Sequence, residues 1–414
     1  MNRRLACVVL MLALAACSSG DSSPQADLTE GVDPDQTSTL PAAPAVTDVA
    51  LAASCQVNSS VIDMTTDGDT WFIGGDFTSA TDVDGTVVTQ VGIAACSVSD
   101  GLLDDQIELD LGDDGVVRAL ALTDEHLLLG GTFSVGGFDS ENFVALDRST
   151  MAVADWGPKR VPGGVQEIVV APDGAVYLAG SFIEVDGVAR PGIARFGADG
   201  VFDSEFSPEL ADGPDDRPLV YAVAATDDGQ VFLGGDFETL NGVAVGGVGR
   251  VDSPTGRITG AFAPDLDDTN PNDGRVQIRE IVMDGSWTYL CGDWWTTEGR
   301  GDKEQQRNVG RFDSSGRADP SFEPWTDGGI RDCALAAGGL VIGGHFDTVS
   351  GEPTRKLALL SLLDGAVTPL VSADSPKGVQ TIAATEQLLG LGGTFSRAGG
   401  QDRSGFAVVQ ISTP

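Results

Sequence analysis

The sequence predicts an all-β protein, a seven-bladed β-propeller of four-stranded antiparallel blades over residues 49–414. Three observations predict this fold. A short motif, in which two small residues precede a polar and an aromatic residue, recurs seven times. The aromatic residues of successive copies lie 56, 49, 55, 57, 52 and 49 positions apart. Each unit holds four short apolar runs divided by turn residues, without helical periodicity, which is the pattern of propeller blades.

The motif is clearest in its fourth copy, Val231-Phe232-Leu233-Gly234-Gly235-Asp236-Phe237. The fifth copy departs most, because Cys291 replaces the first glycine and Trp294 replaces the phenylalanine, which leaves the local geometry open. A lone four-stranded sheet cannot bury both of its faces, so the units must pack in a ring. The copies span residues 71–77, 127–133, 176–182, 231–237, 288–294, 340–346 and 389–395.

Turn residues mark further positions in each unit. Asp186-Gly187 and Asn241-Gly242 predict tight hairpins, because both residue types in each pair tolerate a positive φ. An aromatic-x-Pro mark follows the third apolar run, as in Phe206-Ser207-Pro208. Proline cannot donate to a strand ladder, so this mark is predicted to end an outer, edge strand.

The two ends of the repeat region are complementary. The last unit stops after its third apolar run, residues 406–411, and a strand-like stretch, residues 48–55, precedes the first unit. We expect this stretch to pair with the last blade as its missing strand and to close the ring. An unpaired edge would otherwise invite aggregation.

The order of these landmarks resembles the bacterial delta-60 propeller repeat, a family of uncharacterised function. The shared pattern is apolar strand, Asp-Gly, apolar strand, Gly-Gly-x-Phe, Asn/Asp-Gly, Ile-Ala-Arg-Phe, Asp-Gly, Phe-x-Pro, and the third and fourth units match it best. The resemblance covers roughly residues 55 to 411. It implies a propeller fold, and because its motifs are structural it implies no catalytic residues.

The first residues predict a lipoprotein precursor. Arg3 and Arg4 precede an apolar run, Leu5 to Ala16, that suits a signal peptide (1–16) and is too short for a permanent membrane span. Its end, Leu14-Ala15-Ala16-Cys17, resembles the bacterial lipobox, which implies a diacylglyceryl thioether on Cys17, cleavage before it and a further acyl chain such as palmitate. The alternative is a buried helix of a cytoplasmic protein.

The segment behind Cys17 predicts a disordered tether (17–48), because it is rich in Ser, Asp, Pro and Thr and has almost no large apolar side chains. The partner at this end is therefore the membrane, through the lipid on Cys17. We expect an extracytoplasmic location, on the outer face of the cytoplasmic membrane or at the outer membrane where the envelope has two.

Charge and cysteines narrow the classes of partner and of site. The formal net charge is −38, so the folded body would repel nucleic acid and anionic lipid. In an exported chain, the four cysteines Cys55, Cys96, Cys291 and Cys333 are expected to form two disulfides, for which three connectivities are possible. Proximity in sequence favours the pairs Cys55–Cys96 and Cys291–Cys333. Neither the cysteine spacing nor the two histidines of the chain predict a zinc site.

Three constellations qualify as candidate sites, and each has a structural alternative. The polar residues that precede the motif aromatics either form a ring that binds a cation or a polar ligand, or cap local turns. The acidic stretch 265–274 is either a calcium-binding loop or a solvated loop. Trp294 and Trp295 either form an exposed platform or belong to the core. The polar ring comprises Asp76, Thr132, Ser181, Asp236, Asp293, His345 and Thr394.

The sequence contains no nucleophile elbow, phosphate loop or His-Glu-x-x-His motif. The leading hypothesis is a monomeric propeller that binds an extracytoplasmic protein or glycan, without a cofactor. The alternatives are a carbohydrate-active hydrolase or lyase with acidic catalysts, and a structural envelope protein. Carboxylates that converge in a pocket with perturbed pKa values would favour the enzyme, and an apolar surface patch would favour the binding protein.

Overall fold

The computed structural model describes residues 46, 48–211, 218–267, 276–296, 308–374 and 378–412. All of them belong to one unit, Leu40–Pro414. The signal peptide, Cys17, nearly all of the tether and most of the candidate calcium loop lie outside the described residues. The described part contains no helix long and apolar enough to cross a membrane.

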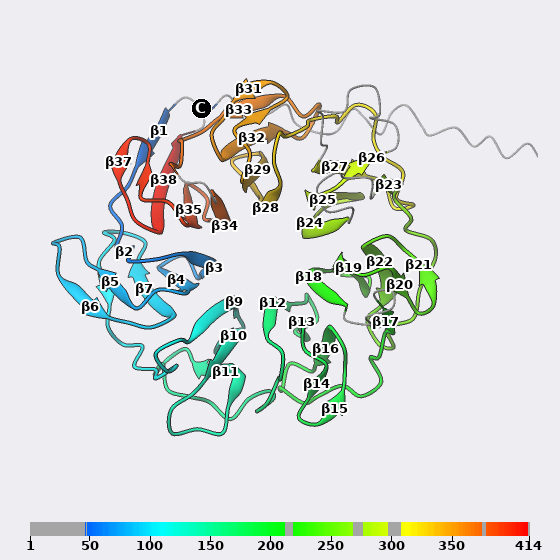
Figure 1. The fold of residues 1–414 in the computed structure, drawn as a ribbon, viewed down its shortest axis with the longest axis horizontal. Helices are drawn as coiled ribbons and strands as arrows, with labels where there is room; N and C mark the ends of the chain where they lie inside the picture. Colours follow the sequence, from blue (N-terminus) through cyan, green and yellow to red (C-terminus); the bar gives the residue numbers. More distant parts are fainter. Residues whose placement is uncertain are drawn as a thin grey trace, which may run out of the picture. The chain divides into compact units, whose positions relative to one another are not determined.

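Every regular element among the described residues is a β-strand, and the sheets surround a central opening (Figure 1). Each motif lies on the second strand of one antiparallel sheet, which we call a repeat sheet. In chain order the repeat sheets contain β3 (Val61–Thr66), β4 (Thr70–Gly75), β7 (Ile93–Ser97) and β8 (Leu103–Asp104); β9 (Val116–Leu122), β10 (His126–Ser134) and β11 (Glu141–Asp147); β12 (Val165–Val170), β13 (Val176–Gly180) and β16 (Ile193–Phe196); β18 (Leu219–Ala225), β19 (Gln230–Asp236) and β22 (Val248–Asp252); β24 (Gln277–Asp284), β25 (Trp287–Asp293) and β27 (Val309–Phe312); β28 (Ile330–Ala336), β29 (Gly339–Gly344), β32 (Leu357–Ser361) and β33 (Val367–Pro369); and β34 (Val379–Ala384), β35 (Leu388–Gly393), β38 (Phe406–Ser412) and β1 (Asp48–Leu51).

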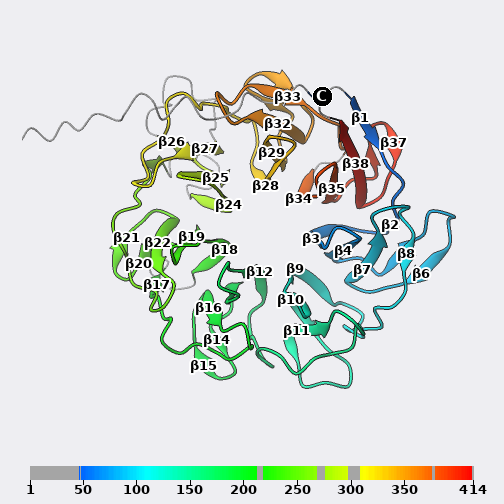
Figure 2. The ribbon, with the colours of Figure 1, turned by 180° about the vertical axis from the view of Figure 1, so that it is seen from behind.

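The first strand of each repeat sheet lines the opening, and we call these the inner strands. Each inner strand contacts the next along the chain, and β34 contacts β3 (Figure 2). The predicted pairing of the two ends is confirmed, because β1 pairs antiparallel with β38, with Val49 opposite Ile411. The segment after β1 is then fastened to β7 by the disulfide Cys55–Cys96.

Small outer sheets follow the motif strands. The predicted hairpins are confirmed at Asp186-Gly187 and Asn241-Gly242, where all four residues have positive φ. The outer strands are β2 (Gln56–Val57), β5 (Ser79–Thr81) and β6 (Val87–Thr89); β14 (Glu184–Val185) and β15 (Val188–Ala189); β17 (Leu210–Ala211), β20 (Thr239–Leu240) and β21 (Val243–Ala244); β23 (Leu266–Asp267) and β26 (Trp295–Thr296); β30 (Thr348–Val349) and β31 (Glu352–Pro353); and β36 (Arg397–Ala398) and β37 (Gln401–Asp402).

The second glycine of the motif has a clear steric cause. A Cβ on Gly235 would overlap the carbonyl oxygen of Leu219 on the inner strand, and the same overlap with an inner-strand or preceding carbonyl recurs in every copy. A Cβ at the first position, as on Gly234, would instead meet side-chain atoms of the next sheet, here Ile278. The first position therefore tolerates Ala179 and Cys291, whereas the second is glycine in all copies.

The open question at Cys291 is resolved by the structure. This residue continues β25 in the same register as the glycines of other copies, and its sulfur bonds to Cys333 on β28 of the next sheet. Both favoured disulfide pairs are confirmed, and the second one links two neighbouring repeat sheets covalently.

The expectation of four strands in every unit is wrong in part. In several described sheets the fourth strand shrinks to an isolated bridge, such as Phe196 with Phe202. The aromatic-x-Pro marks lie beyond these bridges in segments without strand structure, so they do not end an edge strand. Their aromatic rings turn inward instead: Phe206 is fully buried and packs edge-on against Tyr177, with ring centroids 5.3 Å apart.

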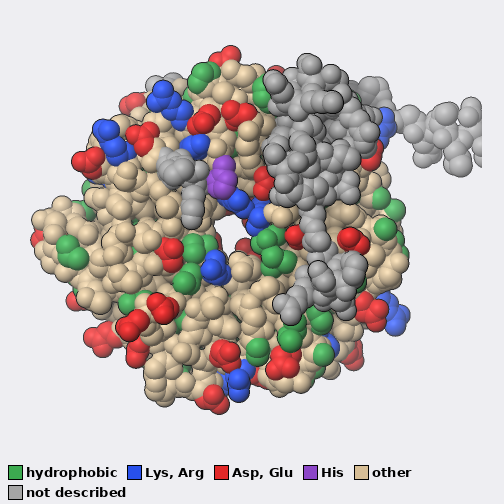
Figure 3. Space-filling model, in the orientation of Figure 1, with side chains coloured by type: hydrophobic (Ala, Val, Ile, Leu, Met, Phe, Trp, Pro, Cys, Tyr) green, Lys and Arg blue, Asp and Glu red, His purple; other side chains and the backbone are tan. Residues whose placement is uncertain are grey.

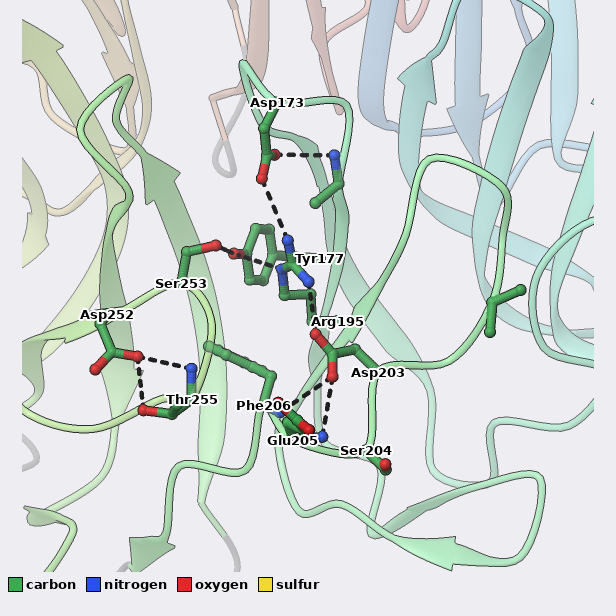
Figure 4. A network of polar contacts seen from close by, with 12 residues as sticks. Asp173, Tyr177, Arg195, Asp203, Ser204, Glu205, Phe206, Asp252, Ser253 and Thr255 are labelled. Carbon is green, nitrogen blue, oxygen red and sulfur yellow. Dashed lines mark hydrogen bonds and ion pairs between the residues drawn. The ribbon is translucent and has the colours of Figure 1, made fainter.

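Polar networks hold neighbouring sheets together beside these rings (Figure 4). Arg195, from the Ile-Ala-Arg-Phe run, forms ion pairs with Asp203 at 2.5 Å and Asp173 at 3.2 Å, and its Nε donates to the Tyr177 hydroxyl. That hydroxyl lies 2.8 Å from the hydroxyl of Ser253, which follows β22 of the next sheet. The arginine of the repeat motif is thus a structural residue between sheets.

Candidate functional site

A β-bulge sits near the start of every inner strand and shapes the central opening. In each repeat sheet the register between the inner strand and the motif strand skips one residue, as at Arg118 between Val117 and Ala119. A bulge re-aims side chains, and here every skipped residue lines the central cavity, as do five of the seven residues that follow the bulges. The skipped residues, which we call the bulge ring, are Ile62, Arg118, Gln166, Tyr221, Arg279, Arg331 and Gln380.

The residues directly after the bulges form a second layer. It contains four carboxyl groups, and all four line the same cavity as the bulge ring. This cavity has a volume of about 430 Å³ and lies at the centre of the ring of sheets. We call these four residues the acidic layer: Asp63, Glu167, Glu280 and Asp332.

Two members of the acidic layer link neighbouring inner strands. Asp63 accepts hydrogen bonds from the backbone N–H of Met64 at 2.7 Å and of Leu120, on the next inner strand, at 2.6 Å. Asp332 accepts one from Ile382 across the next interface at 2.5 Å. Burial nevertheless raises the pKa of both carboxyls to about 7, since desolvation of the charged form outweighs these bonds.

The two glutamates of the acidic layer are less well satisfied. Burial raises the pKa of Glu167, and the nearby charge of Glu280 adds to this rise. Burial also raises the pKa of Glu280, with Asp332 as the next cause, although the backbone N–H of Ile281 donates to it. The layer therefore holds protons near neutral pH that ordinary surface carboxyls have lost.

Two arginines of the bulge ring, Arg279 and Arg331, contact an aromatic ring, an amide and an imidazole. Arg279 stacks over the ring of Tyr221, with its guanidinium carbon 3.8 Å from the centroid, and donates to the side chain of Gln277. Arg331 donates through Nε to Nε2 of His345 at 3.2 Å. Desolvation lowers the pKa of Arg331, and the charge of Arg279 lowers it further, whereas Asp293 favours the charged form.

The arginines and the acidic layer share one cavity without neutralising each other. Within the described residues, no ion pair within 4.0 Å joins Arg118, Arg279 or Arg331 to any carboxylate. The Nε of Arg279 is buried and has no hydrogen-bond partner. Positively charged side chains and a histidine border the opening in the space-filling view (Figure 3). A strongly acidic chain thus has, in its described part, arginines at its central opening that form no ion pair with a carboxylate.

The polar ring predicted from the sequence lies at the same end of the opening as the bulge ring. Its members lie near the ends of the motif strands, and these ends pair with the starts of the inner strands, where the bulges occur. Its described contacts lie both within a unit and between units. Asp76 accepts from the backbone N–H of Ser60, and the hydroxyl of Ser60 lies 2.9 Å from that of Thr394. Only His345 of the seven lines the central cavity in the described part. A ligand-binding role for this ring stays a prediction.

The structure tests the candidate platform at Trp294 but not the candidate calcium loop. Trp294 is 1 % exposed and packs among the buried side chains between β25, β27 and the preceding sheet, so an exposed platform at this residue is wrong. The calcium loop cannot be judged, because residues 268–275 lie outside the described part. Across the described ranges, no three His, Cys, Asp or Glu side chains are grouped so as to hold a metal ion.

Sequence reasoning missed the bulge ring and the acidic layer. One signal was available: a polar residue interrupts the first apolar run of most units, 13 or 14 positions before the second glycine of the motif. Arg118 lies 13 positions before Gly131, and Arg331 lies 13 positions before Gly344. Alignment of the units on the second glycine would have brought these residues into one ring.

The comparisons with known proteins concern the fold. A family model described as a domain of unknown function (DUF5122) beta-propeller matches residues 171–206. The WD40 beta propeller domain of Doa1 is similar in structure, with a TM-score of 0.52 at 12% identity, over 88% of this chain and 97% of that one. A search of curated protein sequences finds no match.

A second solved structure has the same kind of likeness. It is the extracellular domain of the hybrid two component system BT4673 from B. thetaiotaomicron, with a TM-score of 0.50 at 13% identity. The match covers 87% of this chain and 39% of that one, so this chain spans less than half of that domain. These likenesses define an all-β, propeller-like fold, and function has to be argued from the site.

Proposed function

We propose that this chain is an extracytoplasmic binding module, a seven-bladed β-propeller closed by β1 and held at the membrane by a lipid on Cys17. The repeat count, the contacts that run from inner strand to inner strand and the β1–β38 pairing support the propeller. The basic head, the apolar run and Leu14-Ala15-Ala16-Cys17 support the anchor. The ligand is an extracytoplasmic protein or glycan.

The observation that carries the proposal is the central cavity. Binding sites are concave, with a few polar groups placed by a rigid scaffold, and inner strands fixed on both sides by neighbouring sheets are such a scaffold. Three arginines line this cavity and form no ion pair with a carboxylate of the described residues. Charged groups are desolvated at a cost, which a ligand that pairs with them would offset.

The test is retention of a partner from native envelope extract by the full chain, tagged at its C-terminus and purified in detergent. We expect a specific protein or glycan to be enriched over a bait that carries the same lipid and tag but no propeller. Equal recovery on both baits would contradict the binding role. Loss of the partner on addition of a chelator would indicate that a cation takes part.

The anchor has its own test. Cys17→Ala removes the only thiol that the lipobox-like sequence offers for acylation. We expect metabolic labelling with an alkyne fatty acid to mark the wild-type chain and to be lost in this variant. Labelling that survives the substitution would contradict the anchor, and Cys7→Ala, inside the apolar run, is the matched control.

A second candidate function is hydrolysis or elimination on a carbohydrate, and the acidic layer is the observation that favours it. Carboxyls with raised pKa values in a cavity are the groups that general acid–base catalysis needs. If the chain degrades a polysaccharide, Glu167→Gln or Glu280→Gln should lower the release of new chain ends by about 100-fold or more. The exposed Glu205→Gln is the control, and an equal rate in all variants would contradict the enzyme.

A further inference from the structure

The bulge ring places positive charge on two sides of the cavity. Arg279 and Arg331 lie on neighbouring inner strands, β24 and β28, whereas Arg118 lies on β9, separated from them by at least two inner strands in either direction. The two neighbours are close enough for the charge of Arg279 to disfavour that of Arg331. Like charges held together in a partly desolvated place are unfavourable without a counter-charge.

Among the described residues, no carboxylate forms an ion pair with Arg279 or Arg331, although the nearby charge of Asp293 favours the charged form of Arg331. Their described contacts are with a phenol ring, an amide and an imidazole. Arg331 donates a hydrogen bond through Nε to Nε2 of His345, and Arg279 donates one to Gln277, while the buried Nε of Arg279 has no hydrogen-bond partner. A guanidinium group carries five N–H donors, and planar oxyanions accept two of them in parallel hydrogen bonds.

The remaining lining indicates what the oxyanion is attached to. A cavity of about 430 Å³ is far larger than a free inorganic anion requires. Gln166 and Gln380 lie in the same layer as the arginines, and Thr381 and the acidic layer lie beside it. Amides, a hydroxyl and protonated carboxyls both donate and accept hydrogen bonds, which is the chemistry that hydroxyl groups of a sugar need.

We propose that the central cavity binds an acidic sugar, with the carboxylate of the sugar on Arg279 and Arg331 and its hydroxyls on the amide and carboxyl side chains around them. This inference rests on the proposed binding function and names the class of its ligand. Arg118 attracts the anion from the opposite side of the opening. The bulge in each inner strand is the device that turns these side chains inward.

The experiment is calorimetric titration of the full chain at neutral pH with three probes: D-glucuronate, D-glucose and inorganic phosphate. We expect glucuronate to bind at least tenfold more tightly than either of the others. Arg279→Gln and Arg331→Gln should each weaken glucuronate binding by about ten- to hundredfold, the effect of one charge-assisted hydrogen bond. Arg160→Gln, an exposed rim arginine paired with Glu141, should leave the affinity unchanged.

Several results would overturn the inference. Phosphate that binds as tightly as glucuronate would assign the arginines to a free anion, and glucose that binds as tightly would remove their role. Equal affinity in the Arg→Gln variants, with wild-type thermal unfolding, would place the sugar elsewhere. If those variants do not fold, the ranking of the three probes on the wild-type chain decides alone. A chain that retains its envelope partner but binds no glucuronate overturns this inference while the proposed function stands.

Discussion

Two sets of arginines in this molecule have opposite surroundings. Two arginines of the third strands, Arg195 and Arg311, lie between sheets with ion-pair partners: Arg311 is 1 % exposed, pairs with Asp319 at 2.5 Å and donates to carbonyls of the next sheet. Those of the bulge ring, such as Arg331, line an open cavity beside four carboxyls and pair with none of them among the described residues.

This difference assigns the first set of arginines to the stability of the fold and the second set to binding. An arginine that is paired, stacked and enclosed, such as Arg195 or Arg311, holds neighbouring sheets in place. The bulge position recurs in every repeat sheet, but its residue varies from isoleucine to arginine. The fold requires only that this residue be left out of the pairing between the two strands. Stability should therefore depend on the first set of arginines, and ligand affinity on the second.

The largest expected effect is at Arg311. Arg311→Met leaves Asp319, which is 6 % exposed, without its partner, and breaking a buried ion pair costs about 3–5 kcal/mol of unfolding free energy. Arg195→Met is the matched variant, and its loss should be smaller because Arg195 and Asp203 are 17 % and 21 % exposed. Chemical denaturation measures both. Equal losses, or none at Arg311, would contradict the structural role.

A smaller effect is expected at the motif glycines. Gly235→Ala sets a Cβ against a backbone carbonyl that cannot move alone, so we expect a loss of about 1–3 kcal/mol in unfolding free energy. Gly234→Ala meets only side-chain atoms, those of Ile278 and Ile281, and should lose less. Thermal and denaturant unfolding of the two variants measures which one loses more unfolding free energy. A larger loss for Gly234→Ala would contradict the steric explanation of the invariant second glycine.

The acidic layer predicts an unusual dependence of stability on pH. The pKa of Asp63 and of Asp332 is about 7 in the folded chain, against about 3.9 for an unperturbed Asp, so the folded state binds more protons between these values. The contribution of both groups to the unfolding free energy is therefore greatest below about pH 4, falls as the pH rises to 7 and is level above.

The variant Asp63→Asn with Asp332→Asn should flatten that slope. The exposed Asp139→Asn, which changes the net charge without touching the cavity, should keep the wild-type slope. Denaturant unfolding between pH 4 and pH 8 provides the measurement. A slope that is the same in all three proteins would show that the acidic layer does not hold the extra protons.

The smallest effect on stability is expected in the bulge ring itself. Arg331→Gln removes a cation that is disfavoured by desolvation and by Arg279, and it breaks no ion pair among the described residues. We expect the unfolding free energy to change by less than about 0.5 kcal/mol, or to rise slightly. A loss as large as that of Arg311→Met would erase the distinction between the two sets of arginines.

Much of this fold follows from the sequence because its determinants are local. Asp186-Gly187 determines a hairpin through its own φ angles, and the spacing of the glycine motif marks each unit. The pairing of β1 with β38 follows from the strand that the last unit lacks. The bulges do not follow in this way, because a skipped residue is a property of the register between two strands.

The site was harder to predict for that reason. Arg118 and Tyr221 stand within apolar runs that indicate a strand but not which side chains face the central opening. The burial of the Phe206 ring could not be predicted either, because the proline that follows it indicates only that a strand ladder ends there. Both depend on contacts between units that lie about 50 residues apart in the chain.

The most direct test of the account is an experimental structure of the full chain crystallised at neutral pH with D-glucuronate. We predict density for the sugar in the central cavity, with its carboxylate against Arg279 and Arg331, while Arg195 and Arg311 keep their partners between the sheets. A cavity without sugar, in which Arg118, Arg279 and Arg331 form ion pairs with the acidic layer, would contradict the claim that their charge is reserved for a ligand.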